Sequence, residues 1–254
     1  MDVIPLELIF AILSHLSDDQ QSLTACTLVS HAWRSCALPL LYHAPTFANI
    51  QSIRIFADRI PTEAEPMVRE IDLSAIPHRW DCVTDKILAR LMEKCKAIER
   101  IDLHLCSKIH DSSVYLISTT LGSTLTDLTL SQCERLTNAS VFALAAHCPC
   151  LKTLDISHLL VTDVSLRELA ESCTSLEWLS LAYCEFLTEA SIMFLRERCA
   201  RLKFVDLDGC YGMLFENDDD NDMEEYQWTQ EANVVIGKEY EDFEGYFSSD
   251  SELP

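Results

Sequence analysis

Twelve cysteines and eight histidines are the residues of this 254-residue chain that could bind a metal or act as nucleophile and base. A zinc site usually takes its cysteines from short pairs such as C-x-x-C. The one close pair here, Cys148 and Cys150, has a single residue between its members and no matching second pair. Because the histidines also do not pair with carboxylates at ligand spacing, we expect no metal site and no cofactor.

The spacing of the cysteines indicates a structural role. The same eleven-residue interval separates three pairs: Cys95 and Cys106, Cys173 and Cys184, and Cys199 and Cys210. In each pair the first cysteine ends a helix-like segment and the second follows a strand-like one. The chain starts without a basic secretory signal, so a disulfide framework is not expected. We therefore expect reduced, buried cysteines that recur with a repeat, in a cytoplasmic or nuclear protein.

Neither the motifs nor the charge indicates an enzyme or a nucleic-acid-binding protein. There is no glycine-rich nucleotide loop, no H-E-x-x-H and no G-x-S-x-G, so no catalytic residue is assigned. The net charge of −22 argues against nucleic acid and anionic membranes as partners. Residues 216–252 hold fourteen Asp and Glu and one Lys, a local charge of −13, which leaves −9 for the remainder.

A repeat connects the cysteines. Segments such as "LTDLTLSQCERL" and "LEWLSLAYCEFL" start at 98, 125, 151, 176 and 202, at intervals of 27, 26, 25 and 26 residues, and a poorer copy starts at 68. An L-x-x-L-x-L pattern at this period indicates leucine-rich repeats. Each copy is predicted to form a short strand, a turn and a helix, stacked into a curved α/β solenoid with its strands inside. The turns end in residues that suit helix N-caps: Thr84, Asp111, Thr137, Thr162 and Thr188.

The opening stretch "VIPLELIFAILSHLSDD" is too apolar for an ordinary surface helix. On a helical wheel its apolar residues cover roughly 200°, although a surface helix needs a stripe only a little over ~100° wide. The run is also about half of the ~20 residues that a membrane span needs. We therefore predict a helix with two apolar faces to bury.

These segments resemble a known family. The stretch "IPLELIFAILSHL", followed by "LTACTLVSHAWRSCALPLLY", resembles the F-box motif, although Ile4 stands where the family usually has Leu before Pro5. The repeats resemble the cysteine-containing leucine-rich repeats of F-box proteins. The resemblance implies a substrate receptor of an SCF-type ubiquitin ligase, in which the F-box binds a Skp-type adaptor and, through it, a cullin. It implies these adaptor-binding residues: Ile4, Pro5, Leu8, Ile9, Ile12, Leu13, Val29 and Trp33.

Side chains flanking the buried strand positions are predicted to form the substrate surface on the concave face. The candidates are Arg100, Asp102, His104, Asp155, Trp178, Phe204 and Asp206. Because most of this face is acidic or neutral, an unknown basic or neutral protein fits it better than a phosphorylated one. Two alternatives stay open: the aspartates only cap neighbouring backbone, and the aromatic pair only covers the end of the stack.

The predicted organisation is an F-box at residues 1–43, a packed linker at 44–67, repeats at 68–213 and a disordered acidic tail at 214–254. The tail either steers basic substrates by its charge or is an inert solubilising segment. The short stack is also compatible with a truncated member of a longer repeat family. The alternative function is a repeat scaffold that binds proteins without assembling a ligase.

Overall fold

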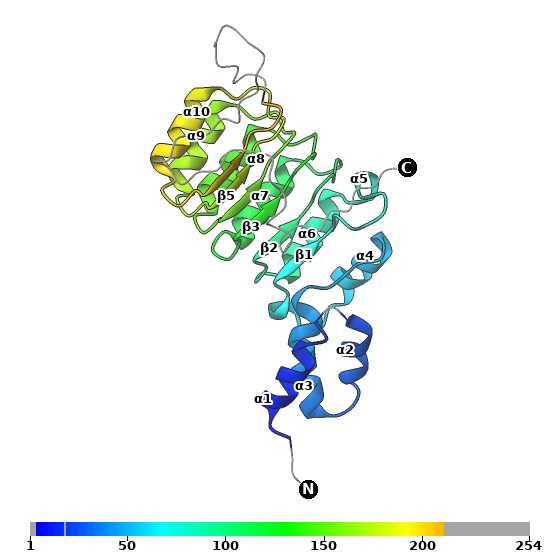
Figure 1. Cartoon of the computed structure of the whole chain (residues 1–254). Helices are drawn as coiled ribbons and strands as arrows, with labels where there is room; N and C mark the ends of the chain where they lie inside the picture. The colour runs from blue at the N-terminus through cyan, green and yellow to red at the C-terminus, as the bar shows by residue number, and fades with distance from the viewer. Residues whose placement is uncertain (1–3, 18, 211–254) are drawn as a thin grey trace, which may run out of the picture.

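The computed structural model describes residues 4–17 and 19–210. A group of helices comes first, and strands that alternate with helices follow (Figure 1). The first part comprises α1 (Leu6–Ser14), α2 (Gln20–Cys26), α3 (His31–His43), α4 (Ile50–Arg59) and the short helix η1 (Glu65–Met67). The second comprises β1 (Glu70–Asp72), α5 (Arg79–Cys82), α6 (Asp85–Lys94), β2 (Arg100–Asp102), α7 (Asp111–Leu121), β3 (Asp127–Thr129), α8 (Asn138–His147), β4 (Thr153–Asp155), α9 (Asp163–Ser172), β5 (Trp178–Ser180), α10 (Glu189–Arg198) and β6 (Phe204–Asp206).

Helices α1, α2 and α3 form a small unit with a core of its own. The Asp19 carboxylate accepts a hydrogen bond from the Ser22 amide (3.0 Å) and caps α2, and the Ser30 hydroxyl caps α3. The buried residues of this core are Ile9, Leu13, Leu23, Cys36 and Ala37. This core is separate from the larger core of the repeats.

The strands form one parallel sheet in the order β1-β2-β3-β4-β5-β6, so each strand pairs with the next strand along the chain. The register aligns equivalent positions of successive repeats: Ile71, Ile101, Leu128, Leu154, Leu179 and Val205 all lie in the buried middle of their strands. The helices stack along the other side of the curved body (Figure 1). The predicted α/β fold, a helical unit followed by a leucine-rich-repeat solenoid, is confirmed. The predicted acidic tail lies outside the described residues.

Helix α4 joins the helical unit to the solenoid. The Asn49 side chain accepts from the amides of Gln51 and Ser52 and begins this helix. The inner face of α4 carries Ile53 and Ala57, which are buried in the core of the repeats. At the other side of the joint, the Tyr42 ring of α3 lies 6.3 Å from the Phe56 ring of α4. Apolar packing therefore connects the two parts.

Cysteines fill the core position that follows several of the strands, and members such as Cys133 and Cys184 bond to the repeat before them. The thiol of Cys133 donates to the carbonyl of Leu103 (3.2 Å), and that of Cys184 donates to the carbonyl of Ile156 (3.3 Å). Burial raises the pKa of both thiols to about 12. Cysteine suits this position because its small apolar side chain packs tightly while its S–H still donates weakly.

Acidic side chains at the helix starts link neighbouring repeats. Asp111 was predicted as an N-cap, which is wrong: His110 is the N-cap of α7, and Asp111 is the first helical residue. Its carboxylate instead accepts from the next repeat, from the Thr137 amide and hydroxyl (both 2.9 Å) and from the Ser140 hydroxyl (2.6 Å). Asp163 makes the equivalent two bonds to Thr188. In the third repeat Asn138 takes this role toward Thr162.

We predict that native alkylation distinguishes the cysteines by burial. Cys133, Cys173 and Cys184 are buried and should react slowly, because thiolate is the reactive form and burial raises their pKa. Cys150 is exposed and should be labelled first. Mass spectrometry of a labelling time course measures the order. Labelling of Cys133 as fast as that of Cys150, or an intact set of disulfides, would contradict the prediction.

We predict that Asp111→Ala lowers the free energy of unfolding by about 2 kcal/mol, because it leaves the Thr137 amide and two hydroxyls without their acceptor. Burial tends to raise the Asp111 pKa, but hydrogen bonds from Ser140 and Thr137 outweigh it and lower the pKa below its usual 3.8. This stabilisation is therefore present above pH ~4 and is lost as the pH falls through the folded-state pKa.

The control for this experiment is Asp111→Asn, which copies the arrangement of Asn138 and Thr162. It should retain most of the stability and remove the acid dependence contributed by this position. Urea unfolding at several pH values measures both effects. Equal stability of the alanine variant and the unchanged chain would show that these bonds between repeats contribute nothing.

Candidate protein-interaction surfaces

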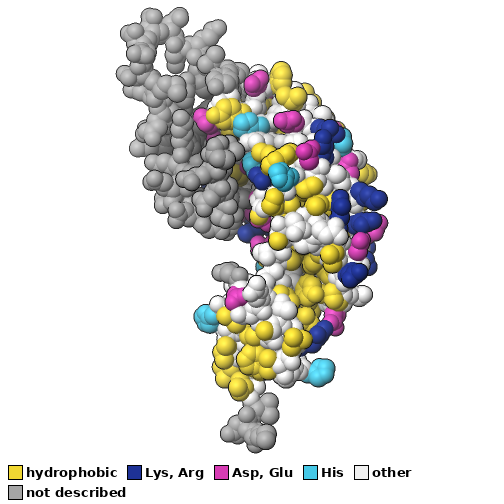
Figure 2. All heavy atoms as spheres, turned by 90° about the vertical axis from the view of Figure 1, so that its right-hand side faces the viewer, with side chains coloured by type: hydrophobic (Ala, Val, Ile, Leu, Met, Phe, Trp, Pro, Cys, Tyr) yellow, Lys and Arg dark blue, Asp and Glu magenta, His cyan; other side chains and the backbone are white. Residues whose placement is uncertain are grey.

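The outer face of α1 is apolar and open to solvent. Leu8 and Ile12 lie one turn apart on this face, and each is 56% exposed. Ile4 and Pro5 precede them and are also exposed. Figure 2 shows hydrophobic side chains gathered over this end of the molecule. Because contiguous exposed apolar surface is unusual on a soluble monomer, this face is a candidate docking surface.

Two of the predicted adaptor-binding residues lie inside the helical unit. Ile9 is 3% exposed and Leu13 is fully buried, so the prediction that they offer docking surface is wrong for this structure. They belong to the second apolar face of α1, which packs on α3, and Trp33 packs partly buried against the same core. The wide apolar arc of the helix therefore has one buried side and one exposed side.

Three exposed apolar residues beside this surface were not among the predicted site residues. Leu6 and Phe10 lie on α1, and Leu28 lies next to Val29 in the turn between α2 and α3. Leu28 is 81% exposed, and Val29 is 62% exposed. The signal for Leu6 and Phe10 was present in the helical wheel, since both lie within the apolar arc. Leu28 has no such signal, because its exposure depends on the path of the turn.

The aspartates of the concave face make local turns. Asp72, Asp102, Asp155 and Asp206 each follow a buried strand residue and accept the backbone N–H two residues further on, at 2.7 to 3.0 Å. Such bonds stabilise the turn that ends each strand. One oxygen of each carboxylate therefore caps neighbouring backbone, which was the alternative to ligand binding.

The aspartates that end the strands differ in how deeply they are buried. Burial, together with the nearby carboxylates of Asp72 and Asp155, raises the pKa of Asp102 to about 6. Asp206 is only 6% exposed, and the Ser180 hydroxyl donates to it, so its assignment to an accessible binding surface is wrong. Between Asp102 and Asp155 in the register lies Thr129, whose buried hydroxyl has no hydrogen-bond partner among the described residues.

The two basic candidates both have charged neighbours. The Arg100 guanidinium lies 3.7 Å from the Glu70 carboxylate and 4.0 Å from the Asp127 carboxylate. Burial lowers the pKa of His104, and the nearby charge of Arg79 lowers it further, so His104 is neutral at pH 7. The concave face therefore offers little positive charge for an anionic ligand.

Two aromatic side chains stack on the last strands of the sheet. The rings of Trp178 and Phe204 are 5.8 Å apart and nearly parallel, at 11°. Both side chains are partly exposed, and the β5–β6 register pairs the two residues directly. The flat faces of such a pair suit apolar groups and cations.

Within the described residues no metal-binding cluster of His, Cys, Asp and Glu is formed.

Comparison with protein families identifies the N-terminal unit. The F-box-like family model matches residues 1–48, which include α1, α2 and α3. The solvent-exposed outer face of α1 therefore belongs to an F-box-like domain.

Curated relatives extend the similarity into the repeats. The chain is 28% identical over 223 residues to the SCF E3 ubiquitin ligase complex F-box protein pof2 of Schizosaccharomyces pombe, which covers 82% of this chain and 45% of the relative. It is 28% identical over 102 residues to the F-box/LRR-repeat protein 12 of Arabidopsis thaliana, which covers 40% of this chain and 26% of the relative. The chain thus spans less than half the length of either relative.

A solved structure shares the fold. A chain in the crystal structure of the yeast Rad7 and Elc1 complex superposes with a TM-score of 0.53 at 15% sequence identity, over 74% of this chain and 44% of that chain. Residues 1–48 thus match an F-box-like domain, a parallel-strand solenoid follows it, and the chain is similar to an F-box protein along both parts.

Proposed function

We propose that this protein is a substrate receptor of an SCF-type ubiquitin ligase, in which the F-box-like domain binds a Skp-type adaptor and the repeats hold the protein to be ubiquitinated. The observation that carries the proposal is the apolar outer face of α1, with Leu8 and Ile12 exposed on an F-box-like domain. In this role the chain binds and positions, the adaptor connects it to a cullin, and its partners carry out the transfer of ubiquitin in the cytoplasm or nucleus.

The position of the joint supports the receptor role. Helix α4 is buried in the repeat core on one side and contacts α3 through aromatic packing on the other. An ion pair between Arg34 of α3 and Glu63 (3.0 Å) adds a further contact across the same region. A bound substrate would therefore keep a defined distance from the adaptor, which a ligase requires to present lysines to the conjugating enzyme.

The concave face supports a basic or neutral substrate. Asp102 and Asp155 can each accept further hydrogen bonds in addition to the one from the backbone. Arg100 already has acidic neighbours. Trp178 and Phe204 provide a flat apolar platform for an aliphatic or cationic side chain.

We predict that Leu8→Asp combined with Ile12→Asp abolishes binding to a purified Skp-type adaptor. Each change places a charge in an interface that must be dry, and loss of one such anchor commonly costs 2 kcal/mol or more. Together the two changes should weaken binding by roughly 1000-fold or more. Both side chains point to solvent, so circular dichroism should remain unchanged. Co-purification and calorimetry measure the loss.

The matched control places the same charges on exposed apolar residues of the repeats, Leu160→Asp with Val164→Asp. This variant should bind the adaptor like the unchanged chain. If the α1 variant also binds normally, the ligase proposal fails and the scaffold function is the better explanation. A loss of binding in both variants would show an effect of net charge rather than a docking surface.

We predict that an arginine-rich peptide binds the concave face more tightly as the pH rises from about 5 to about 7. Asp102 has a raised pKa of about 6, so it is neutral at the lower pH and negatively charged at the higher one. Asp102→Asn should remove part of this increase, by roughly two- to fivefold in affinity at pH 7. Fluorescence anisotropy at fixed salt measures the pH profile.

The control for this profile is Glu197→Gln, which removes one negative charge from α10, away from the strands. The acidic tail is present in all the proteins, so its attraction for the peptide cancels in the comparison. Identical pH profiles for the Asp102 variant and the control would contradict the assignment of the concave face as the binding surface.

A further inference from the structure

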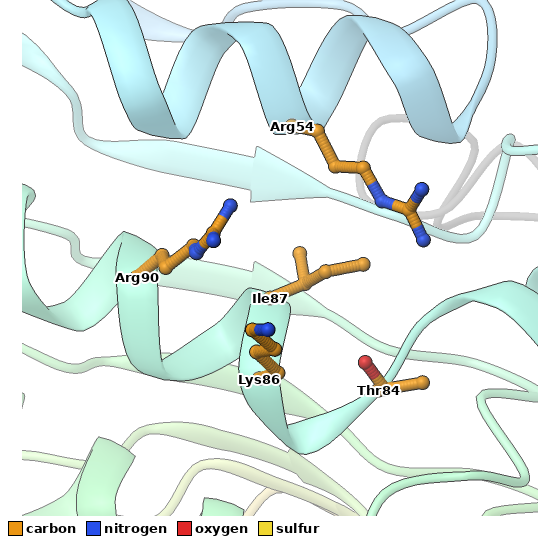
Figure 3. A pocket seen from close by; sticks show the side chains of 5 residues that line it. All are labelled: Arg54, Thr84, Lys86, Ile87 and Arg90. Carbon is orange, nitrogen blue, oxygen red and sulfur yellow. The ribbon is translucent and has the colours of Figure 1, made fainter.

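Three cationic side chains lie along the gap between α4 and α6, away from both surfaces described above. They line a hollow of about 320 Å³ together with Thr84 and Ile87. In Figure 3, Arg54 reaches from α4 toward the start of α6, where Thr84 lies and Ile87 points up into the gap, while Arg90 projects from the next turn of α6 toward α4. A gathering of cations is unexpected in a chain with a net charge of −22.

Only one of these cations has a carboxylate partner among the described residues. Asp58 lies one turn after Arg54 on α4, and its carboxylate oxygens lie 3.0 and 3.3 Å from the Arg90 guanidinium. Arg54 extends toward Thr84 at the start of α6, and Lys86 lines the same hollow (Figure 3). In the described part of the chain neither Arg54 nor Lys86 forms an ion pair, so two positive charges are left uncompensated at this end of the hollow.

The nearest acid of α6 faces a different direction. Asp85 accepts hydrogen bonds from the His110 amide (2.9 Å) and the Ser113 hydroxyl (2.5 Å) of the next repeat, so its carboxylate is oriented toward the stack. Thr84 is the N-cap of α6, but its hydroxyl makes no capping bond. The hollow thus combines two uncompensated cations with a hydroxyl that has no capping role.

We propose that this hollow is an anion site that takes a phosphoryl group. A guanidinium fork and an ammonium bind phosphate oxygens with short, charge-assisted hydrogen bonds, and a hydroxyl adds a further donor. The amide groups at the start of α6 favour negative charge at the same place. A dianion would compensate Arg54 and Lys86 together, which a single carboxylate cannot do.

Occupation of this site would strengthen the joint of the molecule. Arg54 comes from the helix that connects the F-box-like domain to the repeats, and Lys86 comes from the first long helix of the repeats. An anion held by both would add a contact between α4 and α6 beside the Asp58–Arg90 pair. The site is independent of the proposed ligase role, because it uses neither the outer face of α1 nor the strands.

The test uses the full chain and a short serine-phosphorylated peptide of otherwise neutral glycine, alanine and serine residues. Calorimetry at low salt should show binding of this peptide, and the unphosphorylated peptide should not bind. Arg54→Gln with Lys86→Gln should weaken binding by about tenfold, and raising the salt to about 0.5 M should weaken binding to the unchanged chain. Hydrogen exchange in α4 and α6 should slow when the peptide binds, which a non-specific charge effect would not produce.

The matched control removes two exposed cations elsewhere, Lys96→Gln with Lys152→Gln, and should change the affinity by less than about twofold. Equal losses in the two double variants would overturn the proposal, because they would indicate attraction to net charge alone. Inorganic phosphate serves as a competitor: affinity equal to that of the phosphopeptide assigns the site to free phosphate, and weaker affinity assigns it to a phosphorylated protein. Tighter binding of an unphosphorylated peptide with the acidic sequence of residues 216–226 would overturn the phosphoryl assignment.

Discussion

A repeat of about 26 residues cannot bury its own apolar side chains, and this constraint determines most of the architecture. Each strand contributes one inward residue and each helix one inward stripe, so a repeat becomes stable only when a neighbour covers it. The continuous core, which extends from Phe47 in the joint to Cys210 after β6, is the result. Helix α4 covers the first repeat, and in doing so it attaches the F-box-like domain to the stack.

The polar groups of a repeat also depend on its neighbours, which supply their hydrogen-bond partners. Asp111 and Asp163 accept from the helix start of the following repeat, and the thiols of Cys133 and Cys184 donate to a carbonyl of the preceding one. These bonds fix the alignment of successive repeats, because an aspartate reaches its partner only when the two neighbouring helices start level with each other along the helix axis. The polar bonds therefore specify alignment, while the apolar contacts supply the driving force for stacking.

Charge and apolar surface are distributed between separate regions. The apolar face of α1 projects from the small helical unit, the acidic residues line the concave strands, and the uncompensated cations lie at the joint. This arrangement suits a protein that holds two partners at a defined separation.

Much of this protein could be predicted from its sequence, and the reason is periodicity. The repeat length, the strand and helix of each copy and the two apolar faces of α1 depend on residues close together in the chain, which a helical wheel or an alternation pattern reveals. The tertiary structure alone decided which face of α1 is covered, because Ile9 and Leu13 are buried by helices that the pattern does not place. It also decided that Asp111 bonds to the next repeat and that Asp206 is buried. Arg54 and Lys86 lie 32 residues apart in the sequence, and they line the same hollow only because α4 packs along α6.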